Sequence, residues 1–179
     1  MTIYILIFFT ILLLGVLVYV IFIYNKIIKY KNDIDNAFSS VDVMLKKRHE
    51  LIPNIVNAVK GYMSHEKNTL SEIVELRNNA GDRELDTSHK MMVENAITQS
   101  LGKLMIKVED YPDLNSSKHF LQLQQALNET EEHISASRRF YNSAVVQFNK
   151  NIQVFPNNII APWFGFSKRE VYEYKEIER

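Results

Sequence analysis

The sequence predicts an all-α protein in which an N-terminal transmembrane helix is followed by an antiparallel up-and-down helical bundle of three long helices and one short helix. Residues 3–23 are apolar and carry no charge. Most of the remaining chain repeats its apolar residues at helical spacing. Glycine and proline number only 5 and 4 in 179 residues, fewer than strand-and-turn folds use. We expect an anchor at 1–25, a bundle at 26–156 and a C-terminal tail at 157–179.

The anchor prediction depends on the length and the flanks of the apolar run. At about 1.5 Å per residue, residues 3–23 span roughly 30 Å, the thickness of a bilayer's hydrocarbon core. A cleaved signal peptide would need a basic N-terminal region, a shorter apolar core and a small-residue cleavage site. No basic residue precedes Ile3 and no such site follows the run. The sequence therefore favours an uncleaved span.

The lysines after the span predict its orientation. Lys26, Lys29 and Lys31 follow directly, and the first acid is Asp33. Positively charged residues flanking a span favour the cytoplasmic side. We expect a single-pass membrane protein with a short N-terminus outside and the large domain in the cytoplasm.

The first bundle helix is predicted by an apolar stripe in which residues recur at alternating spacings of four and three. Its members are Ile34, Phe38, Val41, Leu45, Ile52, Ile55, Val59 and Tyr62, with Arg48 at the remaining step. So broad a stripe is typical of a helix inside a bundle. Pro53 predicts a kink or a helix start. No breaker lies between Ile23 and Pro53, so this helix can continue directly from the transmembrane helix.

Three further helices follow from the same periodicity and from capping residues. We expect a short helix from near Glu66 to Asn79. We expect a second helix that is capped by Thr87 or Ser88 and ends at Tyr111-Pro112. A long helix, capped by Asn115 or Ser116, should carry an apolar stripe through Phe155 and end at Pro156. The tail carries Trp163, Phe164 and Phe166, and the sequence leaves open whether it folds back on the bundle or dips into the membrane surface.

Composition excludes several kinds of function. Lysine and arginine number 21, as do aspartate and glutamate, so the chain lacks the basic excess of nucleic-acid binders. Without cysteine there is no disulfide, thiolate metal site or cysteine nucleophile. Neither H-E-x-x-H, nor paired Glu-x-x-His, nor a phosphate-binding glycine loop occurs. We predict no catalytic, cofactor-binding or metal-binding residue, and hence no enzyme.

Charged residues beside the apolar stripes are the remaining candidates. A charge buried without a partner is costly, so we expect ion pairs between helices. We interpret them as a structural network that fixes helix register. Its predicted members are Asp42, Arg48, Arg77, Glu109, Glu131, Arg138 and Arg139.

Several motifs resemble those of the LemA family of bacterial membrane proteins. They include Ala37-Phe38-Ser39, Leu45-Lys46-Lys47-Arg48, Leu51-Ile52-Pro53-Asn54, Val59-Lys60-Gly61-Tyr62, Tyr111-Pro112-Asp113-Leu114, Thr130-Glu131, Arg138-Arg139 and Phe155-Pro156. Met44 departs from the glutamine common in the family, and Glu132-His133 from asparagine-arginine. The resemblance implies one N-terminal span, an outside N-terminus and an antiparallel helical bundle, but neither a reaction nor a cofactor.

Two functions are consistent with these observations. The first is a membrane-anchored, non-enzymatic scaffold or interaction module that meets the bilayer through residues 3–23 and binds a protein partner or a second copy of itself. The alternative is a ligand-binding or enzymatic protein that uses a buried polar site between bundle helices. A deep pocket lined by the candidate charges would favour the alternative, and a packed core with those charges paired would favour the scaffold.

Overall fold

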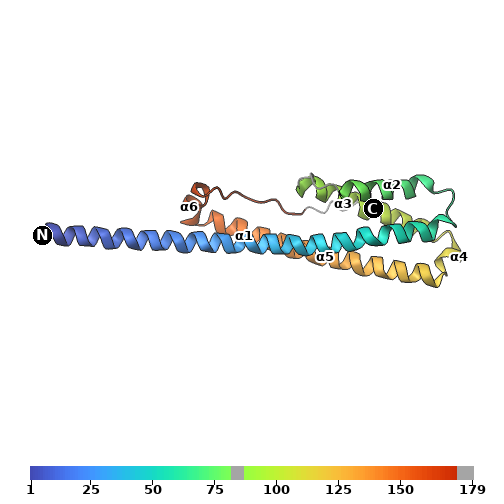
Figure 1. Cartoon of the computed structure of the whole chain (residues 1–179), viewed down its shortest axis with the longest axis horizontal. Coiled ribbons are helices and arrows are strands. Elements are labelled where there is room, and N and C mark those ends of the chain that lie inside the picture. The colour runs from blue at the N-terminus through green and yellow to red at the C-terminus, as the bar shows by residue number, and fades with distance from the viewer. Residues whose placement is uncertain (82–86, 173–179) are drawn as a thin grey trace. The chain divides into compact units, whose positions relative to one another are not determined.

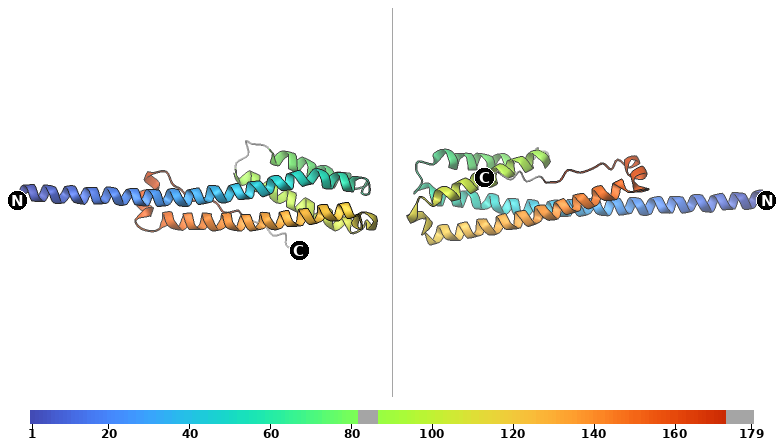
Figure 2. Two further views of the ribbon diagram at one scale, coloured as in Figure 1. Left: turned by 60° about the horizontal axis from the view of Figure 1, so that its bottom comes forward. Right: turned by 180° about the vertical axis from the view of Figure 1, so that it is seen from behind.

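The structure is a computed structural model that describes residues 1–81 and 87–172 (Figures 1 and 2). All regular secondary structure in these ranges is helical, which confirms the predicted fold class. The helices are α1 (Thr2–Lys60), α2 (Lys67–Ala80), α3 (Thr87–Val108), α4 (Pro112–Asn115), α5 (Lys118–Gln153) and α6 (Asn157–Trp163). The chain divides into two compact units, residues 1–39 with 138–171 and residues 40–137 with 172–179. We call them the anchor unit and the bundle unit.

Helix α1 joins the predicted span and the first bundle helix without a break. Its apolar N-terminal part reaches a mean hydropathy of 3.1 over 18 residues, and none of that window is buried within the protein. It is long and apolar enough to cross a membrane. Exposed apolar side chains cover residues 3–9 and 11–14, and they continue to Phe22.

Pro53 lies inside α1 and does not start a helix. A proline inside a helix cannot donate a hydrogen bond to the carbonyl four residues earlier, here that of His49. The Arg77 Nε donates to this carbonyl at 3.3 Å instead. A side chain of α2 therefore satisfies the acceptor that Pro53 leaves open.

In the anchor unit, the C-terminal part of α5 runs antiparallel to α1. Phe38 and Tyr141 pack with ring centroids 5.8 Å apart, and Tyr24 of α1 contacts Phe164 just after α6 at 4.9 Å. Phe148 is buried in this unit at 2% exposure. The tail thus folds back within the anchor unit, with Phe164 on α1 and Arg169 hydrogen-bonded to Asn149 of α5, and residues 173–179 lie outside the described part of the chain.

In the bundle unit, the four longer helical segments, from α1, α2, α3 and α5, alternate in direction. Ion pairs join Asp42 to Lys90 and Arg48 to Glu94, so α1 and α3 run parallel to each other. Ser100 donates to Glu72 at 2.9 Å, and Lys107 pairs with Glu66, which sets α2 antiparallel to α3. The short α4 turns the chain into α5, as Figure 2 shows.

The core of the bundle unit follows the predicted stripes. It is an apolar cluster made of Ile52, Ile55, Val59, Met63, Leu70, Ile73, Ala80, Ile97, Leu101, Leu104, Val108, Leu114, Phe120 and Leu127. Tyr62 is the exception in the first stripe, at 50% exposure, because the helix has ended at Lys60.

Other departures from the prediction also lie at helix ends. Helix α5 begins at Lys118, so neither Asn115 nor Ser116 caps it, and Ser116 instead ends the unpredicted α4. Phe155 is 79% exposed because α5 ends at Gln153 and the heptad phase ends with it. The side chains of the predicted caps Thr87 and Ser88 lie outside the described part of the chain.

Candidate functional site

The bundle unit encloses a polar cluster around Arg48, which occupies a step of the apolar stripe of α1. Its side chain is wholly buried. The Nη1 donates to Glu131 Oε1 at 2.7 Å and to Thr98 Oγ1 at 2.5 Å. The Nη2 donates to the Glu94 carbonyl at 3.0 Å and pairs with Glu94 Oε2. Both terminal nitrogens of the guanidinium are therefore held by α3 and α5.

His49 extends the cluster toward the surface. Its Nε2 lies 2.9 Å from the second carboxylate oxygen of Glu94, and its side chain is 16% exposed. A proton on Nε2 makes this contact attractive. The His49 carbonyl accepts from Arg77 of α2, and the His49 side chain contacts Glu94 of α3, so His49 connects α2 to α3. The cluster thus ties together α1, α2, α3 and α5.

The electrostatics favour charged forms inside the core. Burial alone would raise the pKa of Glu94, but the contact with His49 and the charge of Arg48 outweigh it and leave that pKa lowered. Burial alone would lower the pKa of Arg48, and the two carboxylates Glu131 and Glu94 outweigh it, so that pKa is raised. Each charge is stabilised by its opposite, as paired buried charges require.

The structure places the seven candidate charges in different surroundings. Arg48 and Glu131 lie together in the cluster, and Arg77 lies beside it. Asp42 pairs with Lys90, outside the predicted set. Glu109 is exposed beyond the end of α3, away from the cluster. In the anchor unit Arg138 is buried and Arg139 is exposed.

Sequence reasoning missed Glu94, which is wholly buried. The signal that identifies Arg48 also exists here, because residues 94, 97, 101, 104 and 108 repeat the same alternation of three and four. Thr98 and His49 carry no such signal, since each lies one position off the stripe.

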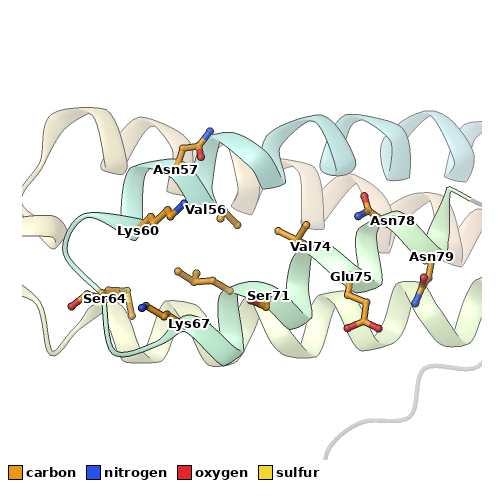
Figure 3. A pocket seen from close by; sticks show the side chains of 12 residues that line it. Val56, Asn57, Lys60, Ser64, Lys67, Ser71, Val74, Glu75, Asn78 and Asn79 are labelled. Carbon is orange, nitrogen blue, oxygen red and sulfur yellow. The ribbon is translucent and has the colours of Figure 1, made fainter.

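A groove on the surface of the bundle unit lies between the end of α1 and α2 (Figure 3). Its volume is about 700 Å³. Val56, Met63, Leu70 and Val74 give it an apolar lining. Lys60 and Lys67 are at the end nearest the α1–α2 connection, whereas Glu75, Asn78 and Asn79 are toward the other end. None of the Arg48 cluster residues lines this groove.

The described residues contain no group of three histidines, acids or cysteines placed to hold a metal ion. In the cluster, the Arg48 terminal nitrogens bind Thr98, Glu131 and Glu94. The arrangement can fix helix register: both terminal nitrogens of the guanidinium are engaged, whereas its buried Nε has no hydrogen-bond partner among the described residues.

Comparison with known proteins places the chain in a family. The model of the LemA family matches residues 37–179, which include the whole Arg48 cluster. The chain belongs to the LemA family. The resemblance seen in the sequence motifs is thereby confirmed, and with it a membrane-associated LemA-like protein.

Two kinds of curated relative share this similarity. Protein LemA of Metamycoplasma hominis is 29% identical over 87% of this chain and 71% of its own length. Magnetosome protein MamQ 2 of Paramagnetospirillum magneticum is 24% identical over 85% of this chain, and MamQ of Magnetospirillum gryphiswaldense is 22% identical over the same share. The matched region spans 65% of each magnetosome protein, slightly less than two thirds.

Proposed function

We propose that this LemA-family protein is a non-enzymatic interaction module held at the plasma membrane by α1. The proposal rests on the hydrogen bonds that engage the terminal nitrogens of Arg48. The one cation in the apolar stripe of α1 has its terminal nitrogens engaged by acceptors of α3 and α5. A guanidinium so engaged is unavailable to a substrate, which argues against a buried polar site as the seat of a reaction.

The groove between α1 and α2 is the surface on which we place the partner. It is open, apolar along its length and charged at its ends. Helical segments of other proteins bind to grooves of this kind through apolar anchors, with charges at the rim setting orientation. Val74 lies in this groove and is 37% exposed.

A photo-crosslinking residue at position 74, introduced into the full chain in cells, tests this role. We expect a reproducible crosslinked product that is lost when Val56, on the opposite side of the groove, is changed to Glu. The same photo-residue at Ile106, an apolar position on α3 that is 69% exposed, is the matched control. Equal crosslinking from both positions, or none from position 74, would contradict an interaction face at the groove.

Small-ligand binding in the same groove is the second candidate. Ligand pockets typically measure about 300–1,000 Å³, and the groove lies within that range. The lysines at one end suit an anionic group on an apolar ligand. Crosslinking from position 74 to a small molecule, with no protein product, would favour this function over the first.

We also propose that the domain faces the cytoplasm. In the anchor unit, eight lysines and arginines outnumber three acids, whereas the whole chain is balanced. Positive residues beside a span are retained on the cytoplasmic side.

The absence of native cysteine permits a clean test of orientation. In Asn128→Cys, a membrane-impermeant maleimide should label the protein only after the membrane is opened, because Asn128 is an exposed residue of the domain. In Thr2→Cys, the same reagent should label intact spheroplasts. Labelling of Asn128→Cys before lysis would reverse the orientation.

A further inference from the structure

The C-terminal part of the anchor unit presents an apolar surface beside the end of the membrane span. Val154, Phe155, Ile159, Trp163 and Phe164 form this surface, and we call them the apolar cap. Their exposed fractions range from 48% for Ile159 to 80% for Trp163. Large exposed side chains gathered in this way mark an interaction surface.

Hydrogen bonds and ring contacts hold the cap in place. The buried Asn157 donates through Nδ2 to the Asn151 carbonyl at 2.8 Å and fixes the turn between α5 and α6. After α6, Gly165 adopts φ 75°, a conformation that favours glycine, and the chain reverses there. Asn149 then clamps Arg169, donating to its carbonyl at 2.8 Å and accepting from its N–H at 2.9 Å.

The cap lies at the level where the span of α1 ends. Phe164 and Phe166 pack on Tyr24, with ring centroids 4.9 and 5.9 Å away, and Tyr24 directly follows the last residue of the apolar run 3–23. Exposed apolar side chains cover α1 up to Phe22, and Ile23 is buried. The aromatic residues that follow α6 therefore pack on α1 where its apolar run ends, and Figures 1 and 2 show α6 beside α1.

The face that α6 turns away from the protein is the unusual one. Asn157, Ile160 and Ala161 are buried, whereas Ile159 and Trp163 are exposed. In a surface helix of a soluble protein the exposed face is polar or charged. Here residues 151–167 contain no charged side chain at all, and Lys150 and Lys168 flank them.

This pattern fits the interfacial zone of a bilayer. Tryptophan and other aromatic residues are enriched where the hydrocarbon core meets the headgroups, because their rings have both apolar and polar parts. Flanking lysines and arginines are attracted to anionic headgroups. The anchor unit carries the basic excess that this attraction needs.

We propose that the apolar cap is a second membrane contact, in which Ile159 and Trp163 enter the interfacial zone of the bilayer that α1 crosses. The occupant is an anionic lipid surface. The cap then fixes the anchor unit against the membrane at two points, the span and α6, and restricts its rotation and tilt. The proposal is independent of whether the groove binds a partner.

Trp163 is the only tryptophan of the chain, so its fluorescence reports on the cap without interference. The full chain is reconstituted in vesicles of phosphatidylcholine and phosphatidylglycerol. Some vesicles contain lipid spin-labelled near the headgroup, and others contain lipid labelled near the chain end. We expect stronger quenching by the shallow label than by the deep one, and weaker quenching by aqueous iodide than for the same chain in denaturant.

Two variants localise the contact. Replacing Ile159 with Asp removes one aliphatic side chain from the proposed bilayer contact. The equilibrium between the bilayer-bound and the water-exposed cap should shift about tenfold toward water, with less shallow-label quenching and more iodide quenching. Phe140→Asp is the control, because Phe140 is 60% exposed on α5 about 20 Å from the end of that helix, and should leave both signals unchanged.

Two results would overturn the proposal. The first is iodide access equal to that of the unfolded chain together with no quenching by either spin label. The second is protection of Trp163 that appears in lipid-free detergent and rises with protein concentration, which would assign the cap to a second copy of the chain. The wild-type measurement decides both, even if a variant fails to fold.

Discussion

Replacing Arg48 with methionine should strongly destabilise the bundle unit. Arg48 is wholly buried, and its removal leaves the wholly buried carboxylate of Glu94 without its cationic partner. Breaking a buried pair by removing one partner costs about 3–5 kcal/mol. At about 2–4 °C per kcal/mol for a full chain of 179 residues, the melting temperature should fall by roughly 6–20 °C.

The assay is thermal unfolding of the full chain in detergent, followed by far-ultraviolet circular dichroism. Lys47→Met is the matched control, since Lys47 is exposed next to Arg48 on the same helix and should change the melting temperature little. Glu131→Gln should cost less than Arg48→Met, because the Glu131 side chain is 28% exposed and solvent screens it.

A double-mutant cycle tests the reasoning more strictly. If the loss in Arg48→Met arises from the unpaired Glu94 charge, adding Glu94→Gln should recover part of it. The coupling energy should lie at about 0.5–3 kcal/mol, the range for contacting residues. Strictly additive losses, or an Arg48→Met shift no larger than that of Lys47→Met, would refute the assignment of a stabilising buried pair.

Three further predictions follow from the same unit. Arg77→Met should lower the free energy of unfolding by about 1–3 kcal/mol, because the His49 carbonyl loses its donor. In a Pro53→Ala background most of this loss should disappear, because the backbone N–H of residue 53 can donate to that carbonyl. Equal losses with Pro53 and with Ala at position 53 would contradict this. The pKa of Glu94 in the folded protein is lowered below 4.5, so the stability that its charge contributes is present above pH 4.5 and is lost as the pH falls through the folded pKa. The urea midpoints of the wild type and of Glu94→Gln should therefore converge at acidic pH. A difference between the two midpoints that stays constant with pH would contradict this prediction. Ile97→Ala should cost about 2–5 kcal/mol in urea unfolding, with exposed Ile106→Ala as the near-neutral control.

The anchor and the helical class could be read from the sequence because they depend on local order. An uncharged run of bilayer length in residues 3–23 and a four-three repeat of apolar residues in the bundle both reflect helix geometry, which is local. For the same reason Arg48 could be identified as a buried charge, since it occupies a step of the stripe. Its partner Glu94 has the same signature, but nothing in the sequence pairs the two residues.

Only the tertiary structure could decide which groups meet. Arg77 donates to the His49 carbonyl, which Pro53 leaves without a backbone donor, because α2 packs beside α1. Arg77 and Pro53 are 24 positions apart in sequence. Whether Phe164 and Phe166 pack on α1 or face solvent depends on the turn between α5 and α6, which no apolar period encodes. Periodicity specifies which face of a helix is buried, whereas long-range packing determines what covers it. For this chain the sequence determined a span followed by a helical bundle, and the tertiary structure closed the Arg48 cluster and placed Phe164 against Tyr24 at the end of that span.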